Sequence, residues 1–371
     1  MTGHILTRDQ LLIDRYLVEG FHAAGGMQEV YVAFDKALNR KVAVKTPKAG
    51  VADRRFKRGA EMSARLNHPN VAATLDYYES DELTFLVEEL ITGSDLERRL
   101  DSDFVAMDPY LAAHVIHHLA RALKVAHGAK ICHRDLKPSN IMMSLDPGMS
   151  SIKLTDFGIA KLAESEIAAE IDLFEKDNST LTTSNTLLGA VPYMAPECWS
   201  DWTSAGQPMD VWALGCISAQ LLLGAPPFGT GRRAIANVVR AEQVGVSVPQ
   251  PVWFGKHAAS ARLESQLWKI ILECLKIAPH ERPTASQIVE WCDALCYPVS
   301  TRMEGSIIMY GGKYAGGGKG TWGHVGTSEG SKFFHLDDYY GELPPKVGQR
   351  VSLSFYPGEP YDRCSPVTAL K

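Results

Sequence analysis

The sequence predicts an α+β chain in which a strand-rich segment, a helical segment and a small all-β unit follow one another. Three observations support this order. Between residues 13 and 45, apolar and polar residues alternate around short Gly or Asn breaks, which is typical of half-buried strands. Between residues 108 and 128, apolar residues recur at helical spacing. After Gly305 glycine and aromatic residues become frequent, and short alternating runs return.

The composition is that of an ordinary globular protein large enough for two compact domains. The 371 residues are 45% hydrophobic and 22% charged, and the net charge of −5 gives no reason to expect a polyanion or an acidic membrane as partner. Seven cysteines, an odd number scattered along the chain, do not make a disulfide framework. They favour a reducing, cytoplasmic setting.

Neither the start nor the most apolar stretch predicts a membrane segment. Residues 1–10 contain no apolar run after a basic patch, so no signal peptide is visible. Residues 211–228 are the most apolar, but two glycines and two prolines interrupt them, and they are too short to span a bilayer. This stretch is interpreted as a buried helix that Asp210 caps, and no membrane is expected as partner.

The residue types best suited to catalysis gather at 133–140, which reads HRDLKPSN. For transfer of a phosphoryl group from ATP, Asp135 can orient a substrate hydroxyl and take up its proton, while Lys137 neutralises developing charge. Asn140 offers an amide oxygen to a magnesium ion, and Arg134 is a fixed cation beside Asp135. Asp156, in the run DFG, follows Asp135 by 21 residues and brings a second carboxylate to the same metal.

This stretch resembles the catalytic loop of the eukaryotic-type (Hanks-type) serine/threonine protein kinases. The resemblance implies a bilobal fold over residues 13–298, with a small lobe at about 13–90, a large lobe at about 91–298 and a leader at 1–12. It also implies ATP and Mg²⁺ as cofactors. The implied partners are a protein substrate with a Ser or Thr acceptor, the chain itself through autophosphorylation, and a cognate phosphatase.

The resemblance extends to the nucleotide site of the small lobe. Residues 22–31 align with the glycine-rich loop, so Gly25, Gly26 and Val30 are expected to contact ATP, although only the central glycine of the motif is kept. Lys45 ends a strand where the family anchors the phosphates. Glu61, on a helical stretch, is expected to pair with Lys45, the alternative being a solvated side chain.

The stretch after the next apolar strand resembles the hinge that holds adenine. Backbone groups of Glu89 and Ile91 are expected to bind the base, and Asp95 is expected at the ribose hydroxyls. Glu88 falls at the gatekeeper position, which lies at the back of the adenine pocket and is normally apolar or threonine. A carboxylate there is costly unless it is paired or protonated, and the sequence alone offers no account of it.

The end of the activation segment and its anchor are also recognisable. Thr186 stands nine residues before the alanine of the Ala-Pro-Glu run at 195–197, the spacing of the family's regulatory phosphorylation site. Arg134 is expected to receive its phosphate. Arg282 matches the family's partner for Glu197, and residues 210–215 match the anchoring helix. Ala190 replaces a threonine that usually helps to position the substrate hydroxyl.

Residues 303–371 resemble a cold-shock-like β-barrel of the OB type. Bases of single-stranded nucleic acid could stack on four rings if they face outward on adjacent strands, namely Trp322, His324, Phe333 and His335. The alternative is a barrel kept as a docking module. From residue 302 onward there are eight Lys and Arg against seven Asp and Glu, so an electrostatic signal for nucleic acid is nearly absent.

Two functions therefore remain open on the sequence. One is an autophosphorylating serine/threonine kinase with a nucleic-acid-binding or docking barrel. The other is a nucleotide-responsive scaffold with little catalysis, which the incomplete glycine-rich loop and the acidic gatekeeper would favour.

Overall fold

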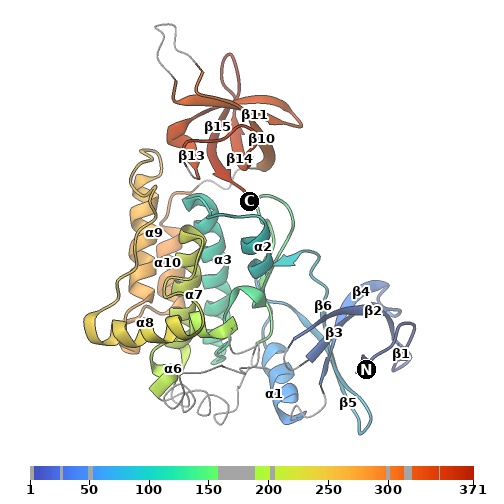
Figure 1. The fold of residues 1–371 in the computed structure, drawn as a ribbon. Helices are drawn as coiled ribbons and strands as arrows, with labels where there is room; N and C mark the ends of the chain where they lie inside the picture. Colours follow the sequence, from blue (N-terminus) through green and yellow to red (C-terminus); the bar gives the residue numbers. More distant parts are fainter. Residues whose placement is uncertain are drawn as a thin grey trace.

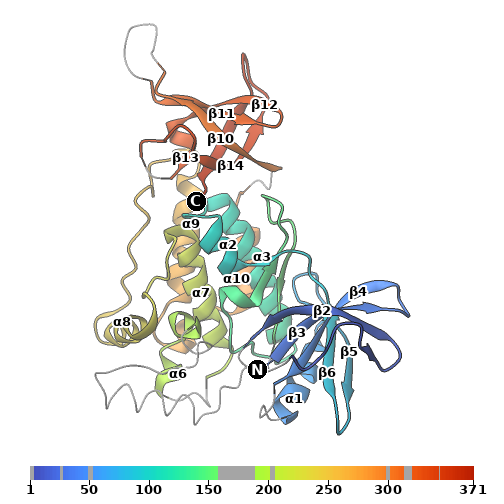
Figure 2. The ribbon, with the colours of Figure 1, turned by 45° about the vertical axis from the view of Figure 1, so that its right-hand side comes forward.

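The computed structural model describes residues 4–25, 28–48, 53–157, 189–200, 205–297, 301–312, 320–341 and 343–371. They form a small sheet-containing lobe, a larger helical lobe and a β-barrel, in that order along the chain (Figures 1 and 2). The barrel lies at the end of the helical lobe remote from the small lobe. The two lobes fit the bilobal architecture predicted from the sequence.

The small lobe is a six-stranded sheet with one described helix against it. The strands are β1 (Leu11–Leu12), β2 (Tyr16–Ala24), β3 (Gln28–Asp35), β4 (Arg40–Pro47), β5 (Thr74–Glu79) and β6 (Thr84–Glu89), in the order β1-β2-β3-β4-β6-β5. β2, β3 and β4 pair antiparallel, which confirms the meander predicted between residues 13 and 45. The helix α1 (Asp53–Ser63) packs Phe56 and Ala60 on Leu86 of β6.

The small lobe includes residues that the sequence interpretation assigned to a leader. Leu6 and Leu12 are buried in the same core as Tyr16 and Val18. The backbone N–H of Leu6 donates to the Tyr31 hydroxyl over 3.0 Å, and β1 pairs with β2. The predicted start of the small lobe at residue 13 is therefore too late. Isolated apolar residues before it already pack on the sheet.

The large lobe is built from helices around one core. They are α2 (Leu96–Ser102), α3 (Pro109–Gly128), α6 (Glu197–Ser200), α7 (Gln207–Leu223), α8 (Gly231–Val244), α9 (Ala261–Cys274) and α10 (Ala285–Asp293). A small sheet of β7 (Ser94–Asp95), β8 (Ile141–Met143) and β9 (Ile152–Leu154) lies beside them. α3 begins where predicted, with the Asp108 side chain accepting from the N–H groups of Tyr110 and Leu111.

The buried helix expected at 211–228 is α7, but its ends differ from the prediction. It begins four residues earlier than expected, so Asp210 lies in its first turn and is not its cap. It stops at Leu223 because Gly224 takes a left-handed conformation with φ +78°, and a Cβ there would lie 2.0 Å from the Val105 carbonyl oxygen. Within the described residues, no helix combines the length and apolar character that a bilayer crossing needs.

The C-terminal unit is a closed barrel of five strands with one short added strand. It contains β10 (Arg302–Tyr310), β11 (Trp322–Thr327), β12 (Gly330–His335), β13 (Tyr339–Tyr340), β14 (Arg350–Tyr356) and β15 (Arg363–Ala369). The order is β12-β11-β10-β14-β15-β13, and β12 also pairs with β15 at Phe333 and Arg363, which closes the sheet. The expected small barrel is thus present, while its likeness to a cold-shock domain stays a prediction.

The barrel is docked on the large lobe through a buried polar contact. Asp108, fully buried at the start of α3, accepts from Arg302 over 2.7 Å and from the Thr368 hydroxyl over 2.6 Å. A second contact stacks the Tyr340 ring on His257, with the centroids 4.1 Å apart. Tyr340 also belongs to the core of the large lobe. The two units therefore share a core as well as a covalent link.

We predict that Arg302→Met lowers the free energy of unfolding by about 3 kcal/mol. This value is near the lower end of the cost of removing one partner of a buried ion pair. The cost is low because Asp108 keeps three other hydrogen-bond donors. The measurement is urea unfolding followed by circular dichroism. Arg350→Met is the matched control, since its pair with Glu304 is half exposed and should contribute less than about 1 kcal/mol. Equal losses from the two variants would contradict the assignment of the buried pair.

The loss of unfolding free energy in Arg302→Met should depend on pH in a defined direction. Burial alone would raise the pKa of Asp108, but Arg302 and the hydrogen bonds outweigh it and hold the pKa below its ordinary value. A lowered carboxyl pKa stabilises the folded state at neutral pH, and this stabilisation fades as the pH falls through about 4 and below. The difference between wild type and Arg302→Met should shrink over that acid range.

Candidate active site

The catalytic-loop residues are held in place by one carboxylate of α7. Asp210, 1% exposed, accepts from the backbone N–H groups of His133 and Arg134, each over 2.8 Å, and from His127 Nε2 over 2.9 Å. Arg134 has a positive φ of +67°, an uncommon backbone conformation that these contacts support. The sequence interpretation placed Asp210 at the start of the anchoring helix, as its cap, and did not identify this role.

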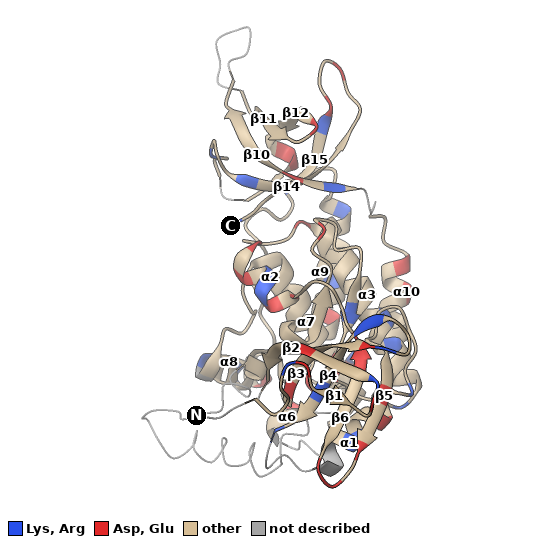
Figure 3. Cartoon of the chain, turned by 90° about the vertical axis from the view of Figure 1, so that its right-hand side faces the viewer, with Lys and Arg blue, Asp and Glu red and all other residues tan. Residues whose placement is uncertain are grey.

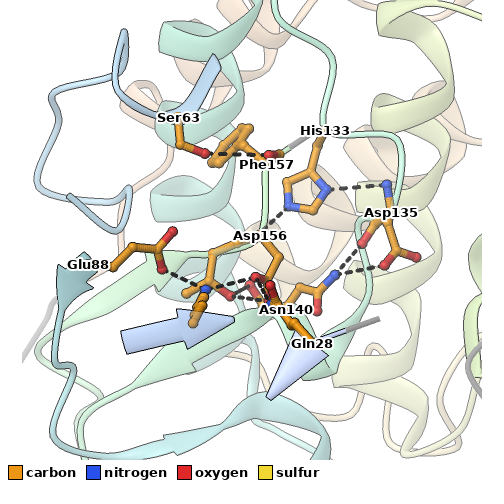
Figure 4. Close-up of polar contacts among 10 residues, drawn as sticks. Gln28, Ser63, Glu88, His133, Asp135, Asn140, Asp156 and Phe157 are labelled. Atoms are coloured by element: carbon orange, nitrogen blue, oxygen red, sulfur yellow. Dashed lines mark hydrogen bonds and ion pairs between the residues drawn. The ribbon is translucent and has the colours of Figure 1, made fainter. Parts of the chain in front are cut away.

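Two of the predicted site residues, Lys137 and Asn140, lie within hydrogen-bond distance of Asp135. Lys137 Nζ is 2.9 Å from Asp135 Oδ2. The Asn140 amide donates to the carbonyl of Asp135 over 2.7 Å and to its carboxylate over 3.1 Å (Figure 4). A carboxylate, a cation and an amide oxygen thus converge at the end of the loop, as the HRDLKPSN pattern predicts.

The second carboxylate, Asp156, is joined to this loop and to the small lobe. The N–H of Thr155 donates to the Asn140 carbonyl over 3.0 Å, so Asp156 follows directly after a residue bonded to the loop. Asp156 Oδ1 accepts from Lys45 over 2.8 Å and from the Gln28 amide over 2.9 Å. Burial would raise the pKa of Asp156, but Lys45 outweighs it and holds the pKa below its ordinary value.

The donor set suits a magnesium ion. The Asn140 amide oxygen and the Asp156 carboxylate are hard oxygen ligands, which Mg²⁺ prefers, together with phosphate oxygens and water. Elsewhere among the described residues, no group of three or more His, Cys, Asp or Glu is arranged to hold a metal ion. Asn140 and Asp156 have the oxygen ligands that could hold such an ion.

The expected partner of Lys45 is wrong. Glu61 is exposed on α1, whereas Lys45 Nζ lies 2.6 Å from Glu88 Oε2 and 2.8 Å from Asp156 Oδ1. Burial alone would lower the pKa of Lys45, but the two carboxylates raise it above its ordinary value. Glu88, which the sequence left unexplained at the gatekeeper position, is thus half of a buried ion pair (Figure 4).

The glycine-rich loop is described on both sides of its tip. The Gly25 N–H donates to the Gln28 carbonyl over 2.9 Å, and Val30 lies opposite Lys45 in the β3–β4 register. Gly26 lies outside the described residues. Gln28 stands where the motif has its third glycine, and its side chain is buried against Asp156. A large polar residue at a glycine position was the sequence signal for this contact.

Two of the residues expected at the base and the ribose have side chains with structural partners. Glu89 accepts from the Ala73 N–H over 3.1 Å and pairs with Lys153 over 2.7 Å. Asp95, expected at the ribose, caps α2 by accepting from the Arg98 N–H over 2.9 Å. Ile91 follows β6 outside regular structure. The ribose role of Asp95 has to be compatible with its capping role, which the Ser/Thr/Asp/Asn preference at helix starts could have indicated.

The anchor of the activation segment is formed as predicted. Arg282 makes two parallel bonds to the Glu197 carboxylate, over 2.7 and 2.8 Å. Its guanidinium also lies over the Trp212 ring, 5.0 Å from the centroid. Thr186, the predicted phosphorylation site, lies outside the described residues, so its contact with Arg134 stays a prediction.

On the barrel, the four predicted rings come from facing positions of β11 and β12. Trp322 pairs with His335, and His324 with Phe333. The Trp322 and Phe333 rings are stacked with centroids 5.9 Å apart, and His324 lies edge-on to both. Two residues that the sequence did not single out extend this group. Tyr361, 48% exposed, contacts His324, and the guanidinium of Arg363 lies over Phe333.

The small lobe, the helical lobe and the loop at 133–140 have the architecture of the protein kinase class. Residues 23–291 match the family model described as the protein kinase domain, and the chain belongs to this family. It is 32% identical over 251 residues to the serine/threonine-protein kinase PrkC of Bacillus subtilis. It is 34% identical over 233 residues to the serine/threonine-protein kinase PknB of Mycobacterium tuberculosis.

The similarity covers the kinase part of this chain and a smaller part of these relatives. The match to PrkC spans 64% of this chain and 36% of PrkC, and the match to PknB spans 60% and 34%. The chain therefore spans about a third of the length of the curated relatives it matches. The family-model match ends before the barrel begins.

Proposed function

We propose that this chain is an ATP- and Mg²⁺-dependent protein-serine/threonine kinase. The observation that carries the proposal is the hydrogen-bonded group of Asp135, Lys137 and Asn140. A backbone hydrogen bond from Thr155 to Asn140 joins this group to the Asp156–Lys45 pair. The names of the relatives support a Ser or Thr acceptor on a protein substrate. The lysine two positions after the catalytic aspartate agrees with that acceptor.

Each residue then has a chemical task in the transfer. Asp135 accepts a hydrogen bond from the acceptor hydroxyl, aligns its oxygen with the γ-phosphorus and takes up its proton. Lys137, held 2.9 Å from Asp135, neutralises charge that develops on the transferred group. Lys45 binds the phosphates, and Asn140 and Asp156 hold the magnesium ion, which supplies positive charge to the phosphate oxygens. Backbone groups of Glu89 and Ile91 bind the base.

We predict that the wild-type chain incubated with Mg-ATP gains mass in steps of one phosphate, while Asp135→Ala, Asp156→Ala and Lys45→Met do not. Loss of the base alone should slow transfer by about 10²–10⁴-fold. The measurement is intact-mass spectrometry over time. Equal incorporation by all four proteins would contradict the proposal. Nucleotide binding without any phosphate transfer by the wild type would favour the scaffold function.

We further propose that the chain phosphorylates its own activation segment at Thr186 and that Arg134 receives the phosphate. Arg134 follows His133 and precedes Asp135, and its backbone is fixed by Asp210. A phosphate contributes about −1.5 to −2 charges and three acceptor oxygens. Its capture at Arg134 would couple the order of the segment directly to the position of the catalytic aspartate.

Thr186→Ala and Arg134→Ala should each lower the rate of phosphorylation of an external protein substrate. The double variant should be little worse than either single variant, because both changes remove one shared contact. Steady-state rates with a generic Ser/Thr substrate measure this, and phosphopeptide mapping locates the modified residue. Full activity of Thr186→Ala, or simple addition of the two losses, would rule out phosphate capture by Arg134.

A second function is proposed for the barrel, on the strength of its ring cluster. Trp322, Phe333 and His324 form contiguous aromatic surface on two strands, the type of platform on which bases of single-stranded nucleic acid stack. The guanidinium of Arg363 adds a cation beside it. Charges of both signs are interspersed on the barrel (Figure 3), so stacking rather than charge would dominate the affinity.

We predict that the full chain binds labelled single-stranded DNA or RNA at low salt, and that Trp322→Ala weakens this binding by about 1–3 kcal/mol. The measurement is fluorescence anisotropy of the labelled oligonucleotide. Trp291→Ala is the control, since Trp291 is 37% exposed but lies on α10 of the large lobe. An absence of saturable binding would favour the barrel as a docking module.

A further inference from the structure

The carboxylate that pairs with Lys45 belongs to the sheet and not to the helix α1. Glu88 and Lys45 lie on β6 and β4, which are neighbours in the sheet, with Ala43 opposite Glu88 and Leu86 opposite Lys45. Side chains two residues apart on a strand share a face, so the register places the two charged groups diagonally across one face. Both side chains are buried, with 7% of Lys45 and 4% of Glu88 exposed. Lys45 Nζ and Glu88 Oε2 are 2.6 Å apart.

From Phe56 to Ser63, where its side chains are described, the buried side of α1 offers no carboxylate for this pair. Between Phe56 and Ser63, the buried positions at helical spacing are Phe56, Gly59, Ala60 and Ser63. None of them is acidic, and the Ser63 hydroxyl donates to the Phe157 carbonyl over 3.4 Å. Glu61, the one glutamate of α1, points to solvent. The described part of the helix packs through small and aromatic side chains, and the carboxylate beside Lys45 comes from the sheet.

We propose that Glu88 is a positioning residue that orients Lys45 toward the phosphates of ATP, in the role that the family resemblance led us to expect of a carboxylate on α1. This inference rests on the proposed kinase function. Among the described residues, Lys45 has two carboxylate partners, Glu88 and Asp156. Since Asp156 is also the residue that would hold the magnesium ion, Glu88 is the partner that remains to fix the lysine.

The origin of the carboxylate changes what controls the site. The β4–β6 pairing fixes Glu88 and Lys45 relative to each other, because their backbones share ladder hydrogen bonds. A shift of α1 would therefore leave this ion pair intact. The arrangement also accounts for an acidic residue at the gatekeeper position, since a cation at hydrogen-bond distance offsets part of the cost of its burial. Burial still outweighs Lys45 and holds the pKa of Glu88 above its ordinary value.

The test is the affinity of the full chain for a non-hydrolysable Mg-ATP analogue, measured by isothermal titration calorimetry, together with KM for ATP and kcat. Glu88→Gln keeps the shape and a neutral acceptor, and Glu88→Met removes the acceptor. We expect Kd and KM to rise by about 10- to 100-fold for Glu88→Met and by less for Glu88→Gln. Glu82→Gln changes an exposed glutamate in the bend between β5 and β6, and this matched control should change neither value.

Several outcomes separate the possibilities. A purely structural role of Glu88 would reduce the active fraction and hence kcat, while KM for ATP stayed unchanged; that result overturns the proposal. Unchanged binding by both Glu88 variants also overturns it, because Glu88 would then not orient Lys45. Tighter binding overturns it as well, because Glu88 would then compete with the phosphates for Lys45. Weaker binding by Glu61→Gln but not by Glu88→Gln would return the role to α1. If wild type fails to bind the analogue, the proposed function itself falls.

Discussion

The active site of this protein depends on the carboxylate of Asp210. It is buried, and it accepts hydrogen bonds from two consecutive backbone N–H groups of the catalytic loop and from His127 at the end of α3. Burial would raise the pKa of Asp210, but these partners lower it, so the group is an anion in the core of the lobe. One loop segment and two long helices, α3 and α7, therefore meet at one charge. The positions of Asp135, Lys137 and Asn140 follow from that meeting.

The parts predicted correctly from the sequence are those whose chemistry fixes the residue types at a fixed spacing. The loop at 133–140 needs an acid, a cation and an amide within eight residues, and the Glu197–Arg282 pair needs two complementary charges. The meander of β2, β3 and β4 and the helix α3 were predictable because their apolar residues follow the period of the element. The barrel strands carry the same alternation, with Val325 and Phe334 inside and Trp322 and Phe333 outside.

The parts that the sequence could not supply depend on contacts between elements. Which carboxylate reaches Lys45 is decided by the register of β4 against β6. The sequence marked Glu88 as a carboxylate in need of a partner, but it did not indicate which residue that partner is. Asp95 could serve a ribose or a helix start on its residue type alone. Leu6 and Leu12 were assigned to a leader because two isolated apolar residues make no pattern, although both are buried in the core of the small lobe.

The buried contact at Asp108 links the stability of the large lobe thermodynamically to the docking of the barrel. The same carboxylate caps the first turn of α3 and holds Arg302 and Thr368 of the barrel. α3 then runs about 30 Å to His127, which is bonded to Asp210. Undocking the barrel would remove two of the four donors that stabilise this charge. Any ligand that binds only the docked barrel therefore adds its binding free energy to the stability of the helix that ends at the catalytic loop.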